Sequence, residues 1–236
     1  MLDIEDIKTT GWESGIGNVI NADCLELMEL MPDKCVDLVV ADPPYLQDSH
    51  GGGGAFGTRM REYHQGVDSL GYGFDDFYLE QIVRVCKKVN AYIFCSKNQL
   101  IQILTFFKNY KYDLLTYHKT NPCPTCNNKY LSDTEYIIYV RESGVKLYGN
   151  YHTKKKYFIQ ENGKSDFQHP TVKPLNIIST LITNSSKEND LIFDPFMGSG
   201  TTARACIDLG RKFIGCEIKK EYCKIWEDRI RQANLL

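Results

Sequence analysis

The sequence predicts an α/β fold in which helices cover both faces of a doubly wound, mainly parallel β-sheet. Three observations support this prediction. Short apolar runs typical of buried strands alternate with amphipathic helical patterns along most of the 236 residues. The connections are short, as expected where helices link parallel strands. Acidic residues also follow several of the predicted strands, at the sheet edge where open α/β folds bind ligands.

The predicted strands are apolar and bounded by polar or turn-forming residues. Strands are expected at residues 18–22, 36–41, 91–95, 112–120, 135–140, 191–194 and 212–218. Helices are expected at 24–31, from Asp75 or Asp76 to Cys86, from Leu100 to Phe107, from Pro174 to about Asn184, at 200–209 and from about Tyr222 onward. Gly210 provides a natural stop for the helix at 200–209. We therefore expect residues 1–236 to form a single domain.

Composition places the chain among soluble intracellular proteins. Hydrophobic residues make up 42% of the sequence and charged residues 25%, which are ordinary values for a globular domain. The N-terminus is acidic and polar, unlike a secretory signal, and no apolar run approaches the ~20 residues that span a bilayer. Nine cysteines, an odd number, indicate reduced thiols rather than a disulfide framework. We therefore expect a cytoplasmic protein without a membrane partner.

Two segments interrupt the alternation of strands and helices. Residues 46–74 contain four consecutive glycines and no periodicity, so a mobile loop is expected. Residues 142–168 predict a basic, irregular insertion. The window 105–175 holds eleven Lys and Arg against six acids, a charge of +5, which leaves −7 for the rest because the total is −2. This asymmetry indicates a basic face on an acidic body.

Four carboxylates lie at or just after the ends of predicted strands: Asp23, Asp42, Asp194 and Glu217. Because the carboxyl ends of parallel strands meet at one edge of the sheet, these acids are expected to lie close together. They would repel one another unless a ligand or ordered backbone groups satisfied them. The sequence therefore predicts a binding site at this edge.

The run 193–202, FDPFMGSGTT, is the second signal for this site. Gly198 and Gly200 allow the backbone to approach a ligand closely, and the helix that follows presents free N–H groups. The run lacks the lysine of a phosphate-binding P-loop, and position 203 is alanine where a dinucleotide fingerprint has glycine. A helix N-terminus of this kind suits a carboxylate, while Glu217 is placed to bind ribose hydroxyls. S-adenosylmethionine carries both groups.

The third signal is Asp42-Pro43-Pro44-Tyr45, directly after the predicted strand at 36–41. The two prolines have nearly fixed φ angles and donate no backbone hydrogen bonds. The result is a rigid segment that presents a carboxylate, carbonyl oxygens and an aromatic ring at the sheet edge. Such a segment is suited to holding a flat polar group.

Taken in order, three motifs resemble those of the β class of DNA amino-methyltransferases, and in particular its small phage or prophage-like members. They are DPPY at 42–45, HPTVKP at 169–174 and DPFMGSGTT at 194–202, and the resemblance extends from about Gly17 to the C-terminus. It implies the Rossmann-like fold of S-adenosylmethionine-dependent methyltransferases. It also implies double-stranded DNA as substrate, and is compatible with a homodimer and with a cognate restriction nuclease.

The resemblance assigns roles residue by residue. The catalytic residues would be Asp42, Pro43, Pro44 and Tyr45, and the cofactor-binding residues Asp23, Cys24, Thr171, Lys173, Asp194, Pro195, Phe196, Gly198, Ser199, Gly200, Thr201, Thr202 and Glu217. Thr171 and Lys173 would close the site near the methionine end. Residues 46–74 and 120–168 would recognise DNA, with phosphate contacts from Lys119, Lys129, Lys154, Lys155 and Lys156.

This chemistry explains the DPPY residues. Asp42 and the Pro43 carbonyl can accept the two hydrogens of an exocyclic amine and favour the pyramidal geometry needed for attack on the sulfonium methyl group. Tyr45 would stack on a base flipped from the duplex, and such stacking contributes ~1–3 kcal/mol. DPPY is commoner in the adenine-N6 enzymes of this family, so we expect N6-adenine methylation.

Several alternatives remain at this stage. The acceptor could be N4 of cytosine or an amine in RNA, and the fold could also serve as a silent nucleic-acid-binding module. A nucleotide hydrolase is disfavoured by the missing lysine after Gly200. Cys123 and Cys126 have the spacing of a zinc site but lack a second pair of ligands nearby, so no metal is expected.

Overall fold

The computed structural model describes residues 2–45, 75–122, 130–161 and 172–233, with side chains placed as far as Glu227. The predicted loop at 46–74 and the Cys123 to Cys126 pair lie outside these ranges. Within them, no helix is long and apolar enough to cross a membrane.

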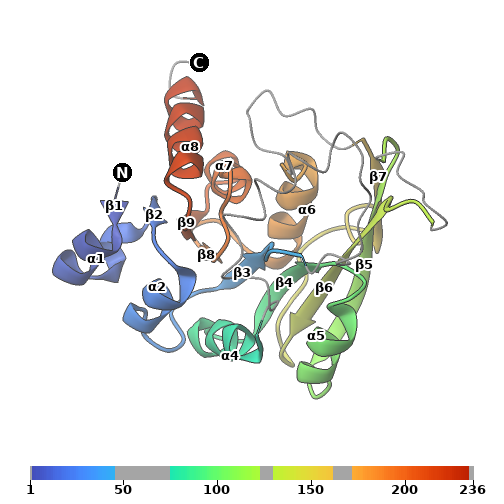
Figure 1. Ribbon diagram of the computed structural model, residues 1–236. Coiled ribbons are helices and arrows are strands. Elements are labelled where there is room, and N and C mark those ends of the chain that lie inside the picture. The colour runs from blue at the N-terminus through green and yellow to red at the C-terminus, as the bar shows by residue number, and fades with distance from the viewer. Residues whose placement is uncertain (1, 46–74, 123–129, 162–171, 234–236) are drawn as a thin grey trace.

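One mixed sheet forms the centre of the described structure (Figure 1). Its strands lie in the order β1 (Leu2–Asp3), β2 (Val19–Asn21), β9 (Lys212–Glu217), β8 (Leu191–Asp194), β3 (Leu38–Ala41), β4 (Asn90–Cys95), β6 (Thr134–Arg141), β5 (Lys111–Lys119) and β7 (Tyr157–Gln160). The strands from β1 to β4 in this order are all parallel. The predicted α/β class is confirmed.

Strand β6 is antiparallel to both of its neighbours, so it runs opposite to the other strands of this sheet. It pairs antiparallel with β4 on one side and with β5 on the other, while β7 is parallel to β5. Tyr136, near the start of β6, lies opposite Cys95, the last residue of β4. The beginning of β6 therefore lies at the same edge of the sheet as the carboxyl ends of the parallel strands.

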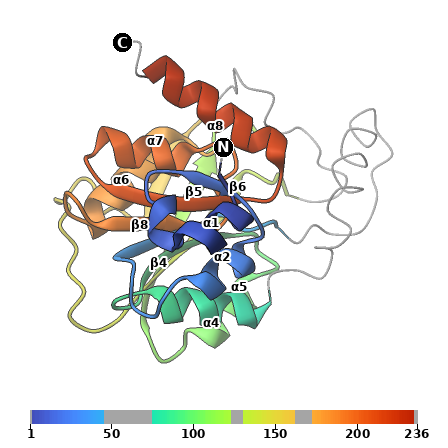
Figure 2. The same cartoon turned by 90° about the vertical axis from the view of Figure 1, so that its left-hand side faces the viewer.

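Helices cover both faces of the sheet, which gives three layers (Figure 2). Apolar side chains from α1, α2, α4 and α5 form one core cluster with the sheet, and those from α6, α7 and α8 form the other. The helices are α1 (Ile4–Thr10), α2 (Cys24–Leu30), α4 (Asp76–Val85), α5 (Leu100–Phe106), α6 (Leu175–Ser185), α7 (Thr201–Asp208) and α8 (Lys220–Ala233), with a 3₁₀ turn at Trp12–Gly15. Strands β3 and β4 are buried along their whole length, as continuous apolar runs between two helical layers should be.

The structure departs from the sequence-based expectations in three places. The basic insertion contains a regular strand, β7, which hydrogen-bonds to β5 and extends the sheet. The N-terminal elements β1 and α1 were not predicted; Asp3 caps α1 through a reciprocal pair of hydrogen bonds with Asp6. Pro174 has extended backbone angles, so it caps α6 rather than forming its first turn.

Candidate active site

Four neighbouring strands bring the predicted acids to one edge of the sheet. In the order β2, β9, β8 and β3, the strands end at or just before Asp23, Glu217, Asp194 and Asp42 respectively. The expected clustering of carboxylates is therefore confirmed. The structure also shows how their charges are satisfied, since each accepts at least one hydrogen bond or ion pair.

The loop after β8 is held by two of these carboxylates. Asp194 accepts a hydrogen bond from the Phe196 amide at 2.9 Å, which turns the chain away from the strand. Glu217 accepts from the Gly198 amide at 2.9 Å and from the Lys219 amide at 2.8 Å, so one side chain connects the ends of β8 and β9. These hydrogen bonds within the protein define the shape of the loop.

Gly200 is required by both conformation and packing. Its φ of +82° belongs to the left-handed region, and an added Cβ would lie 2.9 Å from a ring carbon of Trp226. Gly200 also caps the amino end of α7, whose first residues are buried. The other predicted residues of this loop are Pro195, whose carbonyl accepts from the Cys216 thiol, and the buried Ser199, Thr201 and Thr202.

Two further predicted cofactor residues lie at the start of α2. Asp23 caps this helix by accepting from the Leu25 amide at 2.8 Å, and Cys24 is buried behind it. Across the strand ends, the rings of Tyr78 and Phe196 lie 6.2 Å apart. The loop after β8 and the starts of α2 and α4 thus contribute polar groups and aromatic surface to the same sheet edge.

The electrostatics of this edge favour a bound cation. Burial, together with the charges of Asp42 and Glu217, raises the pKa of Asp194 to about 7, so the ionised forms of these acids destabilise one another. Burial likewise raises the pKa of Glu217. A positively charged ligand would stabilise the ionised forms. The sulfonium of S-adenosylmethionine supplies such a charge, and the residues present therefore fit this cofactor.

The DPPY segment carries an ion pair at its first residue. The Lys173 ammonium lies 2.6 Å from Asp42 Oδ2 and 5.0 Å from the centre of the Tyr45 ring. Burial raises the pKa of Asp42, although Lys173 opposes this shift. Gln99, which is fully buried, donates a hydrogen bond to the Pro44 carbonyl at 3.2 Å and fixes the turn between the two prolines and Tyr45.

Glu135, at the beginning of β6, joins this group from the other side. Its Oε2 accepts from the Tyr45 hydroxyl at 3.0 Å and lies 3.3 Å from the Lys173 ammonium, while its Oε1 lies 2.6 Å from Lys119. Burial alone would raise the pKa of Glu135, but the charges of Lys173 and Lys119 outweigh it and lower that pKa. Burial and the two neighbouring carboxylates raise the pKa of Tyr45, which therefore remains a hydrogen-bond donor.

Sequence reasoning missed Glu135 and Gln99. A signal existed for Glu135, because an acid that opens an antiparallel strand lies at the edge where the parallel strands end. No local pattern marks Gln99, whose contact depends on the packing of the segment after β4 against residue 44. Lys173 was expected near the methionine end of the cofactor; the structure places its ammonium on Asp42.

The predicted DNA-contacting lysines differ in their surroundings. Lys119 is paired with Glu135 and only 16% exposed, and Lys156 forms an ion pair with Asp113. Lys154 and Lys155 are exposed, and the Lys155 ammonium lies 5.8 Å from the Tyr157 ring. Lys154 and Lys155 are therefore the better candidates for phosphate contacts. Lys129 and Thr171 lie outside the described residues.

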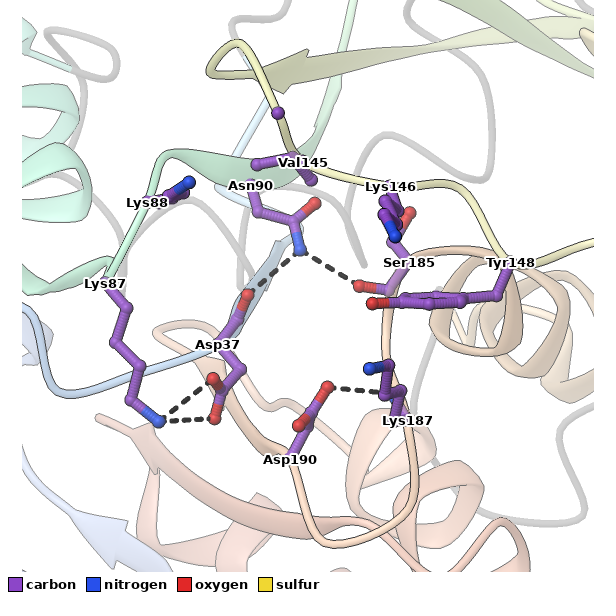
Figure 3. Close-up of a pocket in the computed structure, with 11 residues that line it drawn as sticks. Asp37, Lys87, Lys88, Asn90, Val145, Lys146, Tyr148, Ser185, Lys187 and Asp190 are labelled. Carbon is purple, nitrogen blue, oxygen red and sulfur yellow. Dashed lines mark hydrogen bonds and ion pairs between the residues drawn. The ribbon is translucent and has the colours of Figure 1, made fainter.

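An open polar pocket lies at the opposite edge of the sheet (Figure 3). Lys87 pairs with Asp37 at 2.8 Å, just before β3 begins. The Asn90 amide donates to the backbone carbonyls of Asp37 and Ser185, at 2.9 and 3.0 Å. These contacts join β3, β4 and the end of α6, so the polar groups of this pocket serve to connect elements.

Comparison with known proteins gives a consistent result. The family model described as DNA methylase, of the N6/N4 class, matches residues 36–228. The type II methyltransferase M2.LlaDCHI of Lactococcus lactis subsp. cremoris is 31% identical over 91% of this chain and 89% of its own length. The type II methyltransferase M.HinfI of Haemophilus influenzae is 26% identical over 92% of this chain and 69% of its own.

Solved structures show the same relationship. The M1.HpyAVI–SAM complex has a TM-score of 0.65 and 26% identity, covering 90% of this chain and 98% of the other. The cytosine-N4-specific PvuII DNA methyltransferase superposes with a TM-score of 0.68 at 19% identity, over 89% of this chain and 85% of its own, a likeness that concerns the fold alone.

Proposed function

The chain belongs to the family of N6/N4 DNA methylases and takes its methyl group from S-adenosylmethionine, and we propose that the acceptor is the N6 amine of an adenine flipped from double-stranded DNA. The observation that carries this proposal is the placement of Asp42 and Tyr45 one strand away from the loop after β8. A carboxylate and an aromatic ring, fixed by prolines, face the same edge as the groups that suit the cofactor.

The residues of this chain divide the reaction between them. Asp42 accepts a hydrogen bond from the target amine, so that the nitrogen lone pair is directed at the methyl carbon. Tyr45 stacks on the base and keeps it in the plane that this geometry requires. When the nitrogen–carbon bond forms, the carbon–sulfur electron pair remains on sulfur, and Asp42 takes the proton that the nitrogen then loses.

The cofactor side is built to hold its ligand in place. We expect the loop from Asp194 to Thr202 to surround the methionine part, with Glu217 on the ribose and Asp23 with the Cys24 backbone on the adenine ring. S-adenosylmethionine, when bound, supplies an activated methyl group. The contribution of the protein is mainly to hold nitrogen, carbon and sulfur in line, which can account for ~7–11 kcal/mol of a barrier.

The base can be identified by product analysis. Purified protein is incubated with unmethylated genomic DNA and tritiated S-adenosylmethionine, the DNA is digested to nucleosides, and the products are separated by mass spectrometry. We expect label in N6-methyladenine. Label in N4-methylcytosine would retain the mechanism but overturn the assigned base, and no label in DNA would overturn the proposal.

We further propose that the segments 46–74 and 120–168 recognise DNA within a single domain of residues 1–236. Because β7 belongs to the sheet, deleting 142–168 would damage the fold, and substitution is the better test. The double change of Lys154 and Lys155 to alanine should weaken binding to all sequences similarly and reduce the salt dependence by about two counterions. An unchanged salt dependence would argue against phosphate contacts at these lysines.

We also propose that the chain acts on DNA as a homodimer. Sedimentation with and without a specific duplex tests this state directly, and a monomer on DNA would contradict it. Because the relatives are type II methyltransferases, we propose a cognate restriction nuclease as a partner. A nuclease gene beside the gene for this chain would support such a pairing.

A further inference from the structure

Lys173 contacts the carboxylate to which the proposed reaction assigns the target amine. Its ammonium is 2.6 Å from Asp42 Oδ2, a short charge-assisted contact, and its side chain is only 11% exposed. Although burial alone would lower it, the pKa of Lys173 is raised by Asp42 and Glu135, so the ammonium stays charged. If Lys173 kept this position, the target amine would have to share Asp42 with a competing donor.

Glu135 offers Lys173 a second carboxylate within reach. Its Oε2 is already 3.3 Å from the ammonium, and its other oxygen is anchored by Lys119 at 2.6 Å. Only a small rotation of the lysine side chain separates contact with Asp42 from a full hydrogen bond to Glu135. Glu135 belongs to β6 and its side chain is 12% exposed, less than the 26% of Asp42, so it is the more buried of the two acceptors.

The charges around Asp42 also favour contact between Lys173 and Glu135 during the reaction. Asp42 and Glu135 are balanced by Lys173 and Lys119, so the group of four is neutral. During methyl transfer the positive charge passes from sulfur to the acceptor nitrogen, and an ammonium held on Asp42 opposes this. This electrostatic cost to the transition state is smaller when Glu135 holds the ammonium, because the Asp42 carboxylate can then stabilise the developing positive charge without competition from Lys173.

We propose that Glu135 is a positioning residue that draws Lys173 away from Asp42 when the target base enters, which frees Asp42 to accept the amine hydrogen. The inference rests on the proposed function, since it concerns the same reaction. It adds a residue, in a strand outside the motifs, that prepares the catalytic carboxylate. The Tyr45 hydroxyl, which also donates to Glu135, couples this movement to the ring that stacks on the base.

The test compares Glu135→Gln with Glu142→Gln. The first keeps an oxygen for Tyr45 but removes the charge that attracts Lys173. The second makes the same change just past the other end of β6, roughly 23 Å along the strand, where Glu142 accepts from the Val89 amide. Single-turnover methyl transfer, S-adenosylmethionine affinity and the pH dependence of the rate are measured for both.

We expect Glu135→Gln to slow methyl transfer by about tenfold or more while cofactor affinity stays within about threefold. Its acidic limb should move to lower pH, because Glu135 raises the pKa of Asp42 and its loss lowers that pKa. The other charged or titratable groups near Asp42 are Lys173, Tyr45, Cys95 and Asp194, all of which are unchanged in this variant. Glu142→Gln should match the wild type.

Two outcomes would overturn the proposal: an unchanged rate in Glu135→Gln, or a slower rate whose acidic limb does not move. If that variant does not fold, a crystal structure of the wild type with S-adenosylhomocysteine and duplex DNA decides, with Lys173 expected on Glu135 and beyond hydrogen-bonding distance of Asp42. Lys173 still on Asp42 beside a bound base would contradict the proposal. Failure of the proposed function is distinguishable, because the wild type itself would then not methylate adenine.

Discussion

Both edges of the sheet carry lysine–carboxylate pairs, but the pairs at the carboxyl edge are more deeply buried than the pair at the amino edge. At the amino edge, Lys87 pairs with Asp37 while 52% of the lysine side chain remains exposed. At the carboxyl edge, Lys173 contacts Asp42 and Glu135 with only 11% of its side chain exposed. An exposed pair contributes ~0–1 kcal/mol, whereas burying ions costs several kcal/mol each.

This difference indicates what each edge does. Asp37 also accepts the Leu191 amide, so at the amino edge charge serves to join strands. At the carboxyl edge, Lys173, Asp42 and Glu135 are held largely out of water, although apolar residues could pack in their place at lower cost. Buried charges with perturbed pKa values are typical of sites that bind or react.

The largest effect on the methyl-transfer rate is expected from a comparison of two aspartates at opposite ends of β3. Asp42→Ala should reduce methyl transfer by roughly 10³-fold or more, because the acceptor of the amine hydrogen is lost. Cofactor affinity should stay within about an order of magnitude, since Asp42 acts in the transition state. Asp37→Ala should leave the single-turnover rate within about threefold. Equal losses in both variants would remove the distinction between the edges.

Glu217 and Asp190 provide a second pair. Glu217→Ala should raise the dissociation constant for S-adenosylmethionine by about 10- to 100-fold, because the ribose contact and the anchor of the Gly198 amide are both lost. Asp190→Ala, at the amino edge, should leave that constant unchanged in titration calorimetry. A normal cofactor affinity in Glu217→Ala would contradict the assigned cofactor site.

The raised pKa of Asp194 predicts that the free energy of unfolding depends on pH. Its pKa is about 7 in the folded protein, above the ordinary value of 3.8. Between these values the unfolded chain releases a proton that the folded protein keeps, so the free energy of unfolding falls as pH rises from about 4 to 7, by up to about 4 kcal/mol. Asp194→Asn should remove this part of the decline in denaturant titrations. Parallel curves for both proteins would show that Asp194 is not perturbed.

The smallest expected difference is in stability, between alanine substitutions at two glycines. Gly17, before β2, and Gly200 both have φ near +85°, at +86° and +82°, but only Gly200 has a neighbour that an added methyl group would strike. Gly17→Ala should cost ~1–2 kcal/mol from backbone strain alone. Gly200→Ala should cost about 1–2 kcal/mol more because of Trp226. Equal melting temperatures would mean that Trp226 moves aside freely.

The sequence predicted the central strands of the sheet better than the edge strand β7. Strands such as β3 and β8 are short apolar runs followed by an acid, a pattern that also locates their ends at the site. Strand β7 has exposed residues at alternate positions and lies among lysines, so its sequence indicates a surface segment. Its pairing with β5 depends on tertiary contacts that no local pattern encodes.

The same division applies to the site. Asp42, Asp194 and Glu217 were located from strand ends, and the family resemblance added their expected roles. The contact between Lys173 and Asp42 could not be predicted, because the residues are 131 positions apart and meet only through the packing of α6 against β3 and β4. Glu135 required knowledge that β6 runs antiparallel.

Hydrogen–deuterium exchange with and without saturating S-adenosylmethionine tests the distinction between the edges most directly. We predict slower exchange in peptides covering Asp194–Thr202 and Glu217–Lys219, where backbone amides surround the proposed cofactor. Peptides covering 87–90 and 144–148, at the amino edge, should exchange as before. Protection at the amino edge with none after β8 and β9 would contradict the account.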